Sequence, residues 1–322
     1  MIWKDVGLAS CLILASGIMS KNKLNKIDFV IIFILLMYSF MVRINSIVAV
    51  APLLWFALYR IYSKPKMCLL YSAGIIVVMF GFLNFFNYTI LKAKKDNMQT
   101  YMMMDDLTYL SDKHEKSLIP KIKLDLIKHC AQEIIAENKL VGRLFCYNKS
   151  EEYKKKYPYN YKDLENAWIN AIKTYPFEYS KFRLMSFSYL LRNPNVKPYN
   201  FFYTGHFGKK ENLNFFQRTL VTSLEYYIRI SEKISPFFFK PYFWLLLSII
   251  GLLLTLSSKV DKEKIIFTRI LFISGAFYTL GYLPVTPTAD LRYTYWSTIA
   301  VTLGIVKLIY SDRLFRRKKL IE

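Results

Sequence analysis

FVIIFILLMYSFMV, residues 29–42, and YFWLLLSIIGLLLTL, residues 242–256, are almost uninterrupted runs of apolar side chains. A helix that crosses the roughly 30 Å hydrocarbon layer of a bilayer needs about 20 mostly apolar residues, and its backbone polar groups bond within the helix. The sequence contains seven segments that fit this description. They are Ile2–Ser20, Phe29–Val42, Ser46–Tyr62, Met67–Leu91, Phe237–Leu256, Ile265–Leu283 and Tyr293–Tyr310.

The order of these segments predicts an all-α, polytopic membrane protein with about seven spans. Four segments form an N-terminal bundle in residues 1–91, and three form a C-terminal bundle with a basic tail in residues 236–322. Residues 92–235 are far more polar and predict an aqueous helical domain between spans four and five.

The positive charges of the short loops predict the orientation. With seven alternating spans, fourteen Lys and Arg side chains lie on one face and only Lys4, Arg43 and Arg292 on the other. Cytoplasmic loops are enriched in Lys and Arg. We therefore expect a bacterial inner-membrane protein whose N-terminus and residues 92–235 are extracytoplasmic and whose C-terminus is cytoplasmic. The fourteen are Lys21, Lys23, Lys26, Arg60, Lys64, Lys66, Lys259, Lys262, Lys264, Arg313, Arg316, Arg317, Lys318 and Lys319.

The charge of the intervening domain allows two interpretations. Residues 92–235 contain 25 Lys and Arg against 16 Asp and Glu, which suits an anionic partner such as a lipid phosphate or an acidic glycan. An ordinary solvated surface explains the same excess. A nucleic-acid partner is excluded by the extracytoplasmic location and by the lack of a nucleic-acid-binding motif.

Arg43 interrupts the longest apolar stretch of the sequence. A single helix over residues 29–62 would reach about 50 Å, which is too long for a bilayer, so we expect a hairpin that reverses at Arg43-Ile44-Asn45. An arginine near the headgroup level is a candidate phosphate ligand. The alternative is a side chain that extends to the interface only to hydrate its charge.

The aqueous domain is predicted to be helical. Spacings of three and four residues between apolar side chains mark one helix from Leu164 to Ile172 and another from Ile122 to Ile134, and Phe182–Leu191 and Phe215–Ile234 predict two more. Tyr147–Tyr161 is predicted to be an exposed loop whose tyrosines stack on sugars, rest at the membrane interface or have no special role.

Cysteine and histidine usage gives little evidence of a metal site. Cys130 and Cys146 both lie in the predicted outer domain, where a disulfide is permitted, but their spacing does not show whether they meet. No Cys/His cluster has the spacing of a zinc site, and we predict no bound metal or cofactor. The sequence leaves a requirement for a divalent metal and the oligomeric state open.

Polar side chains recur where the predicted spans reach the outer face. Asp5 stands at the entrance to span one, Asp105 and Asp106 follow span four, and Asp290-Leu291-Arg292-Tyr293 introduces span seven. A carboxylate there could act as a general base, and arginines could hold a phosphate. Each group also has a structural interpretation. Asp105 or Asp106 could cap a helix, Asp290 could pair with Arg292, and Asp5 could anchor a span with Lys4.

Four short motifs resemble bacterial membrane glycosyltransferases of the GT-C type. They are Trp3-Lys4-Asp5, Arg43-Ile44-Asn45, the A-W-x-x-A-I-x-x-Y-P-x-x-Y pattern of residues 167–179, and Asp290-Leu291-Arg292-Tyr293. The resemblance implies a multi-span enzyme that takes sugar from a polyprenyl-phosphate carrier on the extracytoplasmic face. The partners would be that lipid-linked sugar, a glycan acceptor in cell-surface polysaccharide assembly, and membrane lipids.

The resemblance also implies roles for individual residues. Arg43, Asn45, Arg292 and Tyr293 would bind the substrate, and Asp5, Asp105 or Asp106 would be the catalytic base. The chain departs from the family pattern because it lacks the initial span and the first outer loop that usually carries the catalytic aspartate. We therefore expect a form shortened at its N-terminus.

Two other classes remain open. A polysaccharide polymerase or ligase would use lipid-linked glycan with arginines of the large outer segment, here Arg143, Arg183 and Arg192. A non-enzymatic scaffold or transport subunit would not depend on any outer carboxylate.

Overall fold

The computed structural model describes residues 4–93, 99–136, 140–149, 161–192, 214–257, 262–286 and 290–319. Every regular element in these ranges is a helix, which confirms the all-α class. The chain divides into two compact units. Unit 1 comprises residues 1–94, 229–282 and 291–322, and unit 2 comprises residues 95–228 and 283–290.

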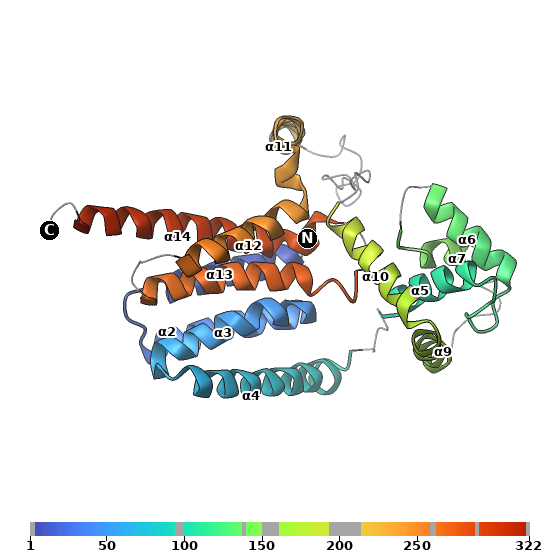
Figure 1. Ribbon diagram of the computed structural model, residues 1–322, viewed down its shortest axis with the longest axis horizontal. Helices are drawn as coiled ribbons and strands as arrows, with labels where there is room; N and C mark the ends of the chain where they lie inside the picture. The colour runs from blue at the N-terminus through green and yellow to red at the C-terminus, as the bar shows by residue number, and fades with distance from the viewer. Residues whose placement is uncertain are drawn as a thin grey trace. The chain divides into compact units, whose positions relative to one another are not determined.

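Unit 1 is a bundle of helices from both ends of the sequence. Figure 1 shows most of its helices side by side with their axes along a common direction. Helix α13 packs against α3, α12 and α14, and α1 packs against α2 and α14. The helices are α1 (Lys4–Met19), α2 (Lys26–Val42), α3 (Ile47–Tyr62), α4 (Pro65–Asn84), α12 (Pro241–Ser257), α13 (Lys262–Leu280) and α14 (Tyr295–Lys319).

Local sequence signals account for the helix ends in the first half of unit 1. Asn25 caps α2, since its side chain accepts a hydrogen bond from the Asp28 backbone N–H, and the Asp28 carboxylate accepts from the Asn25 N–H. Arg43 then adopts extended backbone angles, and the 3-10 turn η1 (Ile44–Ser46) leads into α3. Pro65 occupies the first turn of α4, where its missing N–H has no helical partner to lose. The reversal expected at residues 43–45 is therefore present.

The surface of unit 1 is apolar and its interior contains hydroxyl groups. Large aliphatic side chains such as Leu70 and Val77 on α4 and Leu253 on α12 are mostly exposed. Hydroxyls lie inside, where Ser274 of α13 donates to the Ala49 carbonyl of α3 and accepts from the Trp296 indole N–H of α14. Helices that pack in lipid associate through such polar contacts, because lipid tails are as apolar as leucine.

Two small residues allow close helix packing around one ring. A Cβ added at Gly251 of α12 would lie 2.3 Å from the Phe272 ring of α13, and one added at Gly304 of α14 would lie 2.8 Å from it. The ring therefore fills the space that both glycines leave, and it fixes how closely the three helices approach.

Two helical stretches among the described residues are long and apolar enough to cross a membrane. They are Ile44–Tyr62 and Pro65–Ile90, and the second includes the π-helical turn η2 (Phe85–Ile90). Pro241–Leu256 and Ile265–Leu280 are apolar but shorter. Two of the seven predicted segments therefore meet the length and composition expected of a membrane span.

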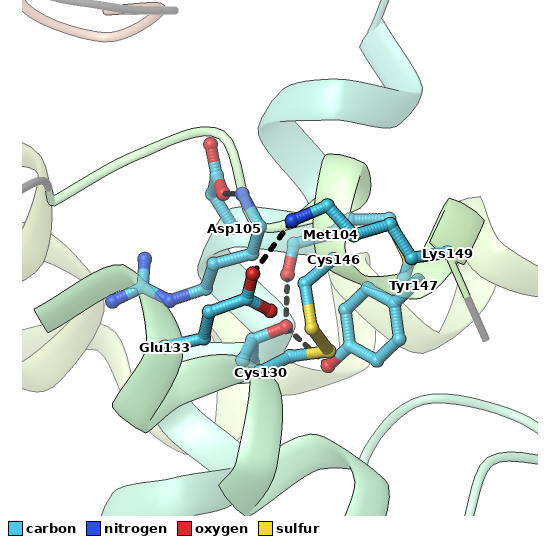
Figure 2. The surroundings of a disulfide bond; sticks show 9 residues. Met104, Asp105, Cys130, Glu133, Cys146, Tyr147 and Lys149 are labelled. Carbon is cyan, nitrogen blue, oxygen red and sulfur yellow. Dashed lines mark hydrogen bonds and ion pairs between the residues drawn. A yellow bond between two sulfur atoms is a disulfide. The ribbon is translucent and has the colours of Figure 1, made fainter. Parts of the chain in front are cut away.

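Unit 2 is organised around α5 (Gln99–Lys113). This helix packs against α6 (Leu124–Ala136), α7 (Leu144–Lys149), α9 (Tyr161–Thr174) and α10 (Pro176–Leu190). Cys130 of α6 and Cys146 of α7 form a disulfide within the apolar core, so the pairing that the sequence left open is present. Figure 2 shows this bond with Tyr147 beside it and the Glu133–Lys149 ion pair across it.

Several expectations for this domain need correction. The helix that contains Asp105 and Asp106 begins at Gln99, so neither aspartate caps it. Tyr147 was expected in an exposed loop, but it is buried in α7 and its hydroxyl lies 2.8 Å from the Thr108 hydroxyl. The predicted loop also overlaps the end of α7 at Lys149 and the start of α9 at Tyr161, and its residues 150–160 lie outside the described residues. The apolar stripe from Leu164 is confirmed, since Leu164 and Ala171 are buried in α9.

Candidate functional site

The candidate site lies at one end of the unit 1 bundle. Helix α1 begins there, α2 ends there at Val42, α13 ends there, and α14 is entered there through the 3-10 turn η6 (Leu291–Thr294). Consecutive helices of the bundle run antiparallel, so these four chain ends meet at the same level. We call the side chains that meet there the Asp5–Arg43 cluster; it consists of Asp5, Arg43, Tyr282, Arg292 and Tyr293.

Asp5 and Arg43 form a two-point ion pair. Arg43 Nη2 lies 2.7 Å from Asp5 Oδ2, and Arg43 Nε lies 2.5 Å from Asp5 Oδ1. The side chain of Asp5 is only 5% exposed, whereas that of Arg43 is 18% exposed. Asp5 also lies in the first turn of α1, where the helix dipole favours a negative charge. The pair therefore holds the guanidinium plane in a defined orientation.

Two tyrosines complete the surroundings of the guanidinium. Arg43 Nη1 donates to the Tyr282 hydroxyl at 3.4 Å, and the Arg43 Cζ atom lies 4.9 Å from the centroid of the Tyr293 ring. The Tyr282 and Tyr293 rings are themselves 5.1 Å apart. Because Arg43 is already fixed by its ion pair and by the tyrosine ring, it loses little rotamer freedom when it binds a ligand.

Arg292 also lies against the Tyr293 ring. Its Cζ atom lies 5.0 Å from the Tyr293 centroid, and its Nη2 donates to the Tyr293 hydroxyl at 3.2 Å. Two guanidiniums therefore lie against the Tyr293 ring in this cluster. Such an arrangement suits an anion, and arginine is well matched to phosphate because its N–H groups form a planar fork.

The cluster brings together four of the seven site residues predicted from the sequence, namely Asp5, Arg43, Arg292 and Tyr293. Asn45 lies two residues from Arg43 in η1 and is exposed. Tyr282 was missed, because it stands in an apolar segment and no local pattern links it to Arg43, which lies 239 positions away in the sequence.

Asp105 and Asp106 belong to unit 2, where both are buried and bonded. Asp105 accepts hydrogen bonds from the backbone N–H groups of Gly142, at 2.9 Å, and Arg143, at 2.7 Å. Gly142 has a φ of 99°, which a glycine adopts readily and which aims both amides at one carboxylate. Asp106 accepts from the Trp168 indole N–H at 2.8 Å and from Arg183.

Burial controls the titration of both carboxyl groups. It raises the pKa of Asp105 above its ordinary value, against the opposing effect of Arg143 and the two backbone amides. It raises the pKa of Asp106 to about 6, against the opposing effects of Arg183 and Trp168. Perturbed carboxyls of this kind occur at catalytic sites and also in structural ion-pair networks.

The contacts of these aspartates are those of a structural network. Arg143 and Arg183 are also buried, and their Cζ atoms lie 5.1 Å and 5.3 Å from the ring centroid of Phe182. Two of the three arginines considered for a polymerase, Arg143 and Arg183, thus neutralise the aspartates inside the core. The A-W-x-x-A-I-x-x-Y-P-x-x-Y motif contributes to the same network, since Trp168 bonds Asp106 and contacts the ring of Tyr179 edge-on.

One group of potential metal ligands occurs in the described residues. Atoms of His129, Glu133 and Cys146 lie within 4.8 Å of one another. The Cys146 sulfur is bonded to Cys130, and Glu133 pairs with Lys149 at 2.7 Å, so two of the three groups are already engaged.

Comparisons with known proteins leave the site to be interpreted from its own geometry. No family model matches the chain, and neither a curated protein nor a solved structure matches it.

Proposed function

We propose that this protein is a polytopic membrane glycosyltransferase that transfers sugar from a polyprenyl-phosphate donor in cell-surface polysaccharide assembly. The observation that carries the proposal is the Asp5–Arg43 cluster, in which two arginines and a carboxylate meet at the end of an apolar helix bundle. A lipid phosphate combines the two properties that this location favours, an anionic head and an apolar tail.

The apolar exterior of unit 1 supports seven spans rather than the two that satisfy length and composition criteria. Exposed aliphatic side chains cover α2 and α12 as well as α4, and tilted or slightly short helices are accommodated by local thinning of the bilayer. Continuous apolar surface of this extent on a soluble protein would promote aggregation.

Two independent features support an extracytoplasmic unit 2. Among the described short-loop residues, Lys21 and Lys23 follow α1 and Arg60 lies in the last turn of α3, where it donates to the carbonyls of Lys21 and Asn22. In addition, the Cys130–Cys146 disulfide is typical of an oxidising compartment. The segments that lead to and from unit 2, after α4 and before α12, leave the bundle at the end that carries the Asp5–Arg43 cluster.

The charged groups have different roles in the proposed step. Arg43 and Arg292 bind the donor phosphate, and Asp5 accepts the proton of the acceptor hydroxyl as its oxygen attacks the anomeric carbon. The sugar–phosphate bond breaks and the phosphate departs with the bonding electrons, paired with the two guanidiniums. Asp5 is preferred to Asp105 and Asp106 as the base because it belongs to the same cluster as Arg43, whereas those two belong to the unit 2 network.

The test compares two arginine variants in a strain that lacks the gene. We expect Arg43→Ala to abolish restoration of the missing sugar in the surface glycan, because the phosphate loses its oriented partner. Arg60→Ala is the matched control at the opposite end of the bundle and should restore the sugar. The measurement is mass spectrometry of the glycan repeats, with the amount of each variant in the membrane determined in parallel.

The outcomes separate the possibilities. Normal glycan with Arg43→Ala would remove Arg43 from the site. A deletion strain that makes short, capped repeats instead of repeats lacking one sugar would point to a polymerase. An unchanged glycan in the deletion strain would contradict an enzymatic role in this pathway.

A further inference from the structure

Helix α11 (Phe215–Ile234) is the most exposed long helix among the described residues of the chain. It has 20 residues, and none of them is buried. Most helical stability in proteins comes from packing of an apolar face, so a helix of this length without a buried residue needs another surface to cover it.

Four large apolar side chains of α11 share one face, whereas Phe215 lies on the same side as Thr222. Phe216, Leu220 and Leu224 follow at intervals of four residues, and Ile234 lies on the same side. Between 47% and 73% of each of these side chains is exposed. Thr222, Arg229 and Lys233 lie on the opposite side of the helix by the same spacing.

The end of α11 continues into the apolar surface of unit 1. Ser235 ends the helix, the 3-10 turn η5 (Pro236–Phe239) follows, and α12 begins at Pro241 after the extended residue Lys240. These two breaks separate α11 from α12 in the chain (Figure 1). The amphipathic helix is thus joined by a short, bent connection to an apolar helix of the bundle.

The connection itself has the composition of a membrane interface. The Phe237, Phe238 and Phe243 rings lie within 5.4 Å of one another, measured between centroids, and the Trp244 indole N–H donates to the Phe238 carbonyl at 2.7 Å. Aromatic side chains are enriched where spanning helices reach the headgroups. Lys240 in the same segment adds a positive charge at that level.

We propose that α11 lies on the outer leaflet of the bilayer, with Phe216, Leu220, Leu224 and Ile234 inserted at the boundary between headgroups and acyl chains. This inference rests on the proposed membrane embedding of unit 1. A flat amphipathic helix of this kind is held by its apolar area, with cationic side chains on its polar face near the lipid phosphates. It would place the chain that returns from unit 2 at the depth of a lipid-linked donor's headgroup.

The experiment uses the full chain in nanodiscs of phosphatidylcholine and phosphatidylglycerol. Cys11 and Cys68 are replaced by alanine, the disulfide is kept, and a nitroxide is attached to one new cysteine at a time. Leu220→Cys and Leu224→Cys probe the apolar face, Thr222→Cys is the matched control on the polar face, and Val77→Cys probes the exposed face of α4. Collision with oxygen reports lipid contact, and collision with a soluble nickel chelate reports water contact.

We expect oxygen to dominate at positions 220, 224 and 77 and the nickel chelate to dominate at 222. Water contact at 220 and 224 with lipid contact at 77 would overturn the inference and leave the membrane proposal intact. Water contact at all four positions would overturn both the inference about α11 and the proposal that unit 1 spans the membrane. Labels at 220 and 224 that are immobile and reached by neither reagent would show that protein covers this face, which also overturns the inference.

Discussion

Each unit contains an aromatic ring that lies against two arginines, and the comparison of these rings separates a candidate site from a structural core. In unit 1 the ring is Tyr293, with Arg43 and Arg292. In unit 2 the ring is Phe182, with Arg143 and Arg183. The two arrangements differ in exposure, since the side chain of Arg43 is 18% exposed whereas that of Arg183 is 3% exposed.

Exposure therefore distinguishes two arrangements of similar composition. The unit 2 network is buried and its four charged side chains sum to zero, so it links α5, α9, α10 and the turn before α7 without needing a ligand. In the unit 1 cluster Arg43 remains partly exposed. A partly exposed guanidinium is accessible to an anion, whereas the buried guanidiniums of unit 2 are enclosed by protein.

The largest expected effect is in the unit 2 network. Asp106→Ala leaves the buried guanidinium of Arg183 without its carboxylate, and breaking a buried pair in this way costs about 3–5 kcal/mol. Hydrogen exchange measured by mass spectrometry should show lost protection in α5, α9 and α10 and unchanged protection in the unit 1 helices. Asp163→Ala, at an exposed position in the first turn of α9, is the control and should leave protection near wild type. Full protection in the Asp106→Ala variant would show that the network does not stabilise unit 2.

An intermediate effect is expected from the disulfide. Replacing Cys130 and Cys146 together by serine removes a cross-link between positions 16 residues apart, and loops of about that length contribute roughly 3 kcal/mol. Proteolysis under native conditions should become faster at sites in α6 and α7. The same assay on Cys11→Ser, in unit 1, should give the wild-type rate, and equal rates for all three proteins would contradict the prediction.

The smallest effect is expected from the loss of a buried hydroxyl group in unit 1. Ser274→Ala removes the contacts to the Ala49 carbonyl and the Trp296 indole, and interhelical hydroxyl bonds in membrane bundles contribute about 0.6 kcal/mol on average, up to about 1.7. A fall in thermal stability of a few degrees or less is expected in detergent, with altered Trp fluorescence. Thr302→Ala, at an exposed position of α14, should change neither property. A loss as large as that of Asp106→Ala would mean that hydroxyl contacts matter as much as buried charges.

The sequence predicts elements well where a pattern is local. The range Phe215–Ile234 is predicted and observed with the same ends, and the reversal at Arg43 follows from the length of the apolar stretch around it. Bonds between distant positions leave no such pattern. Nothing near Asp106 indicates Arg183, 77 positions later, and the suggestion that Asp105 or Asp106 caps a helix is wrong because α5 begins earlier, at Gln99. The buried amides that hold Asp105 come from Gly142 and Arg143, whose turn has no periodicity.

The discontinuity of unit 1 has a consequence for protein synthesis. The Ser274–Ala49 bond joins positions 225 residues apart, and the Arg43–Tyr282 contact joins positions 239 apart. At about 5–20 residues per second, roughly ten to fifty seconds pass between the emergence of Arg43 and that of its tyrosines. During that interval α3 lacks its packing partner α13, and Arg43 lacks its contacts with Tyr282 and Tyr293. A ribosome that stalls before α13 therefore releases a half-bundle with uncovered polar groups, a product suited to recognition by membrane proteases.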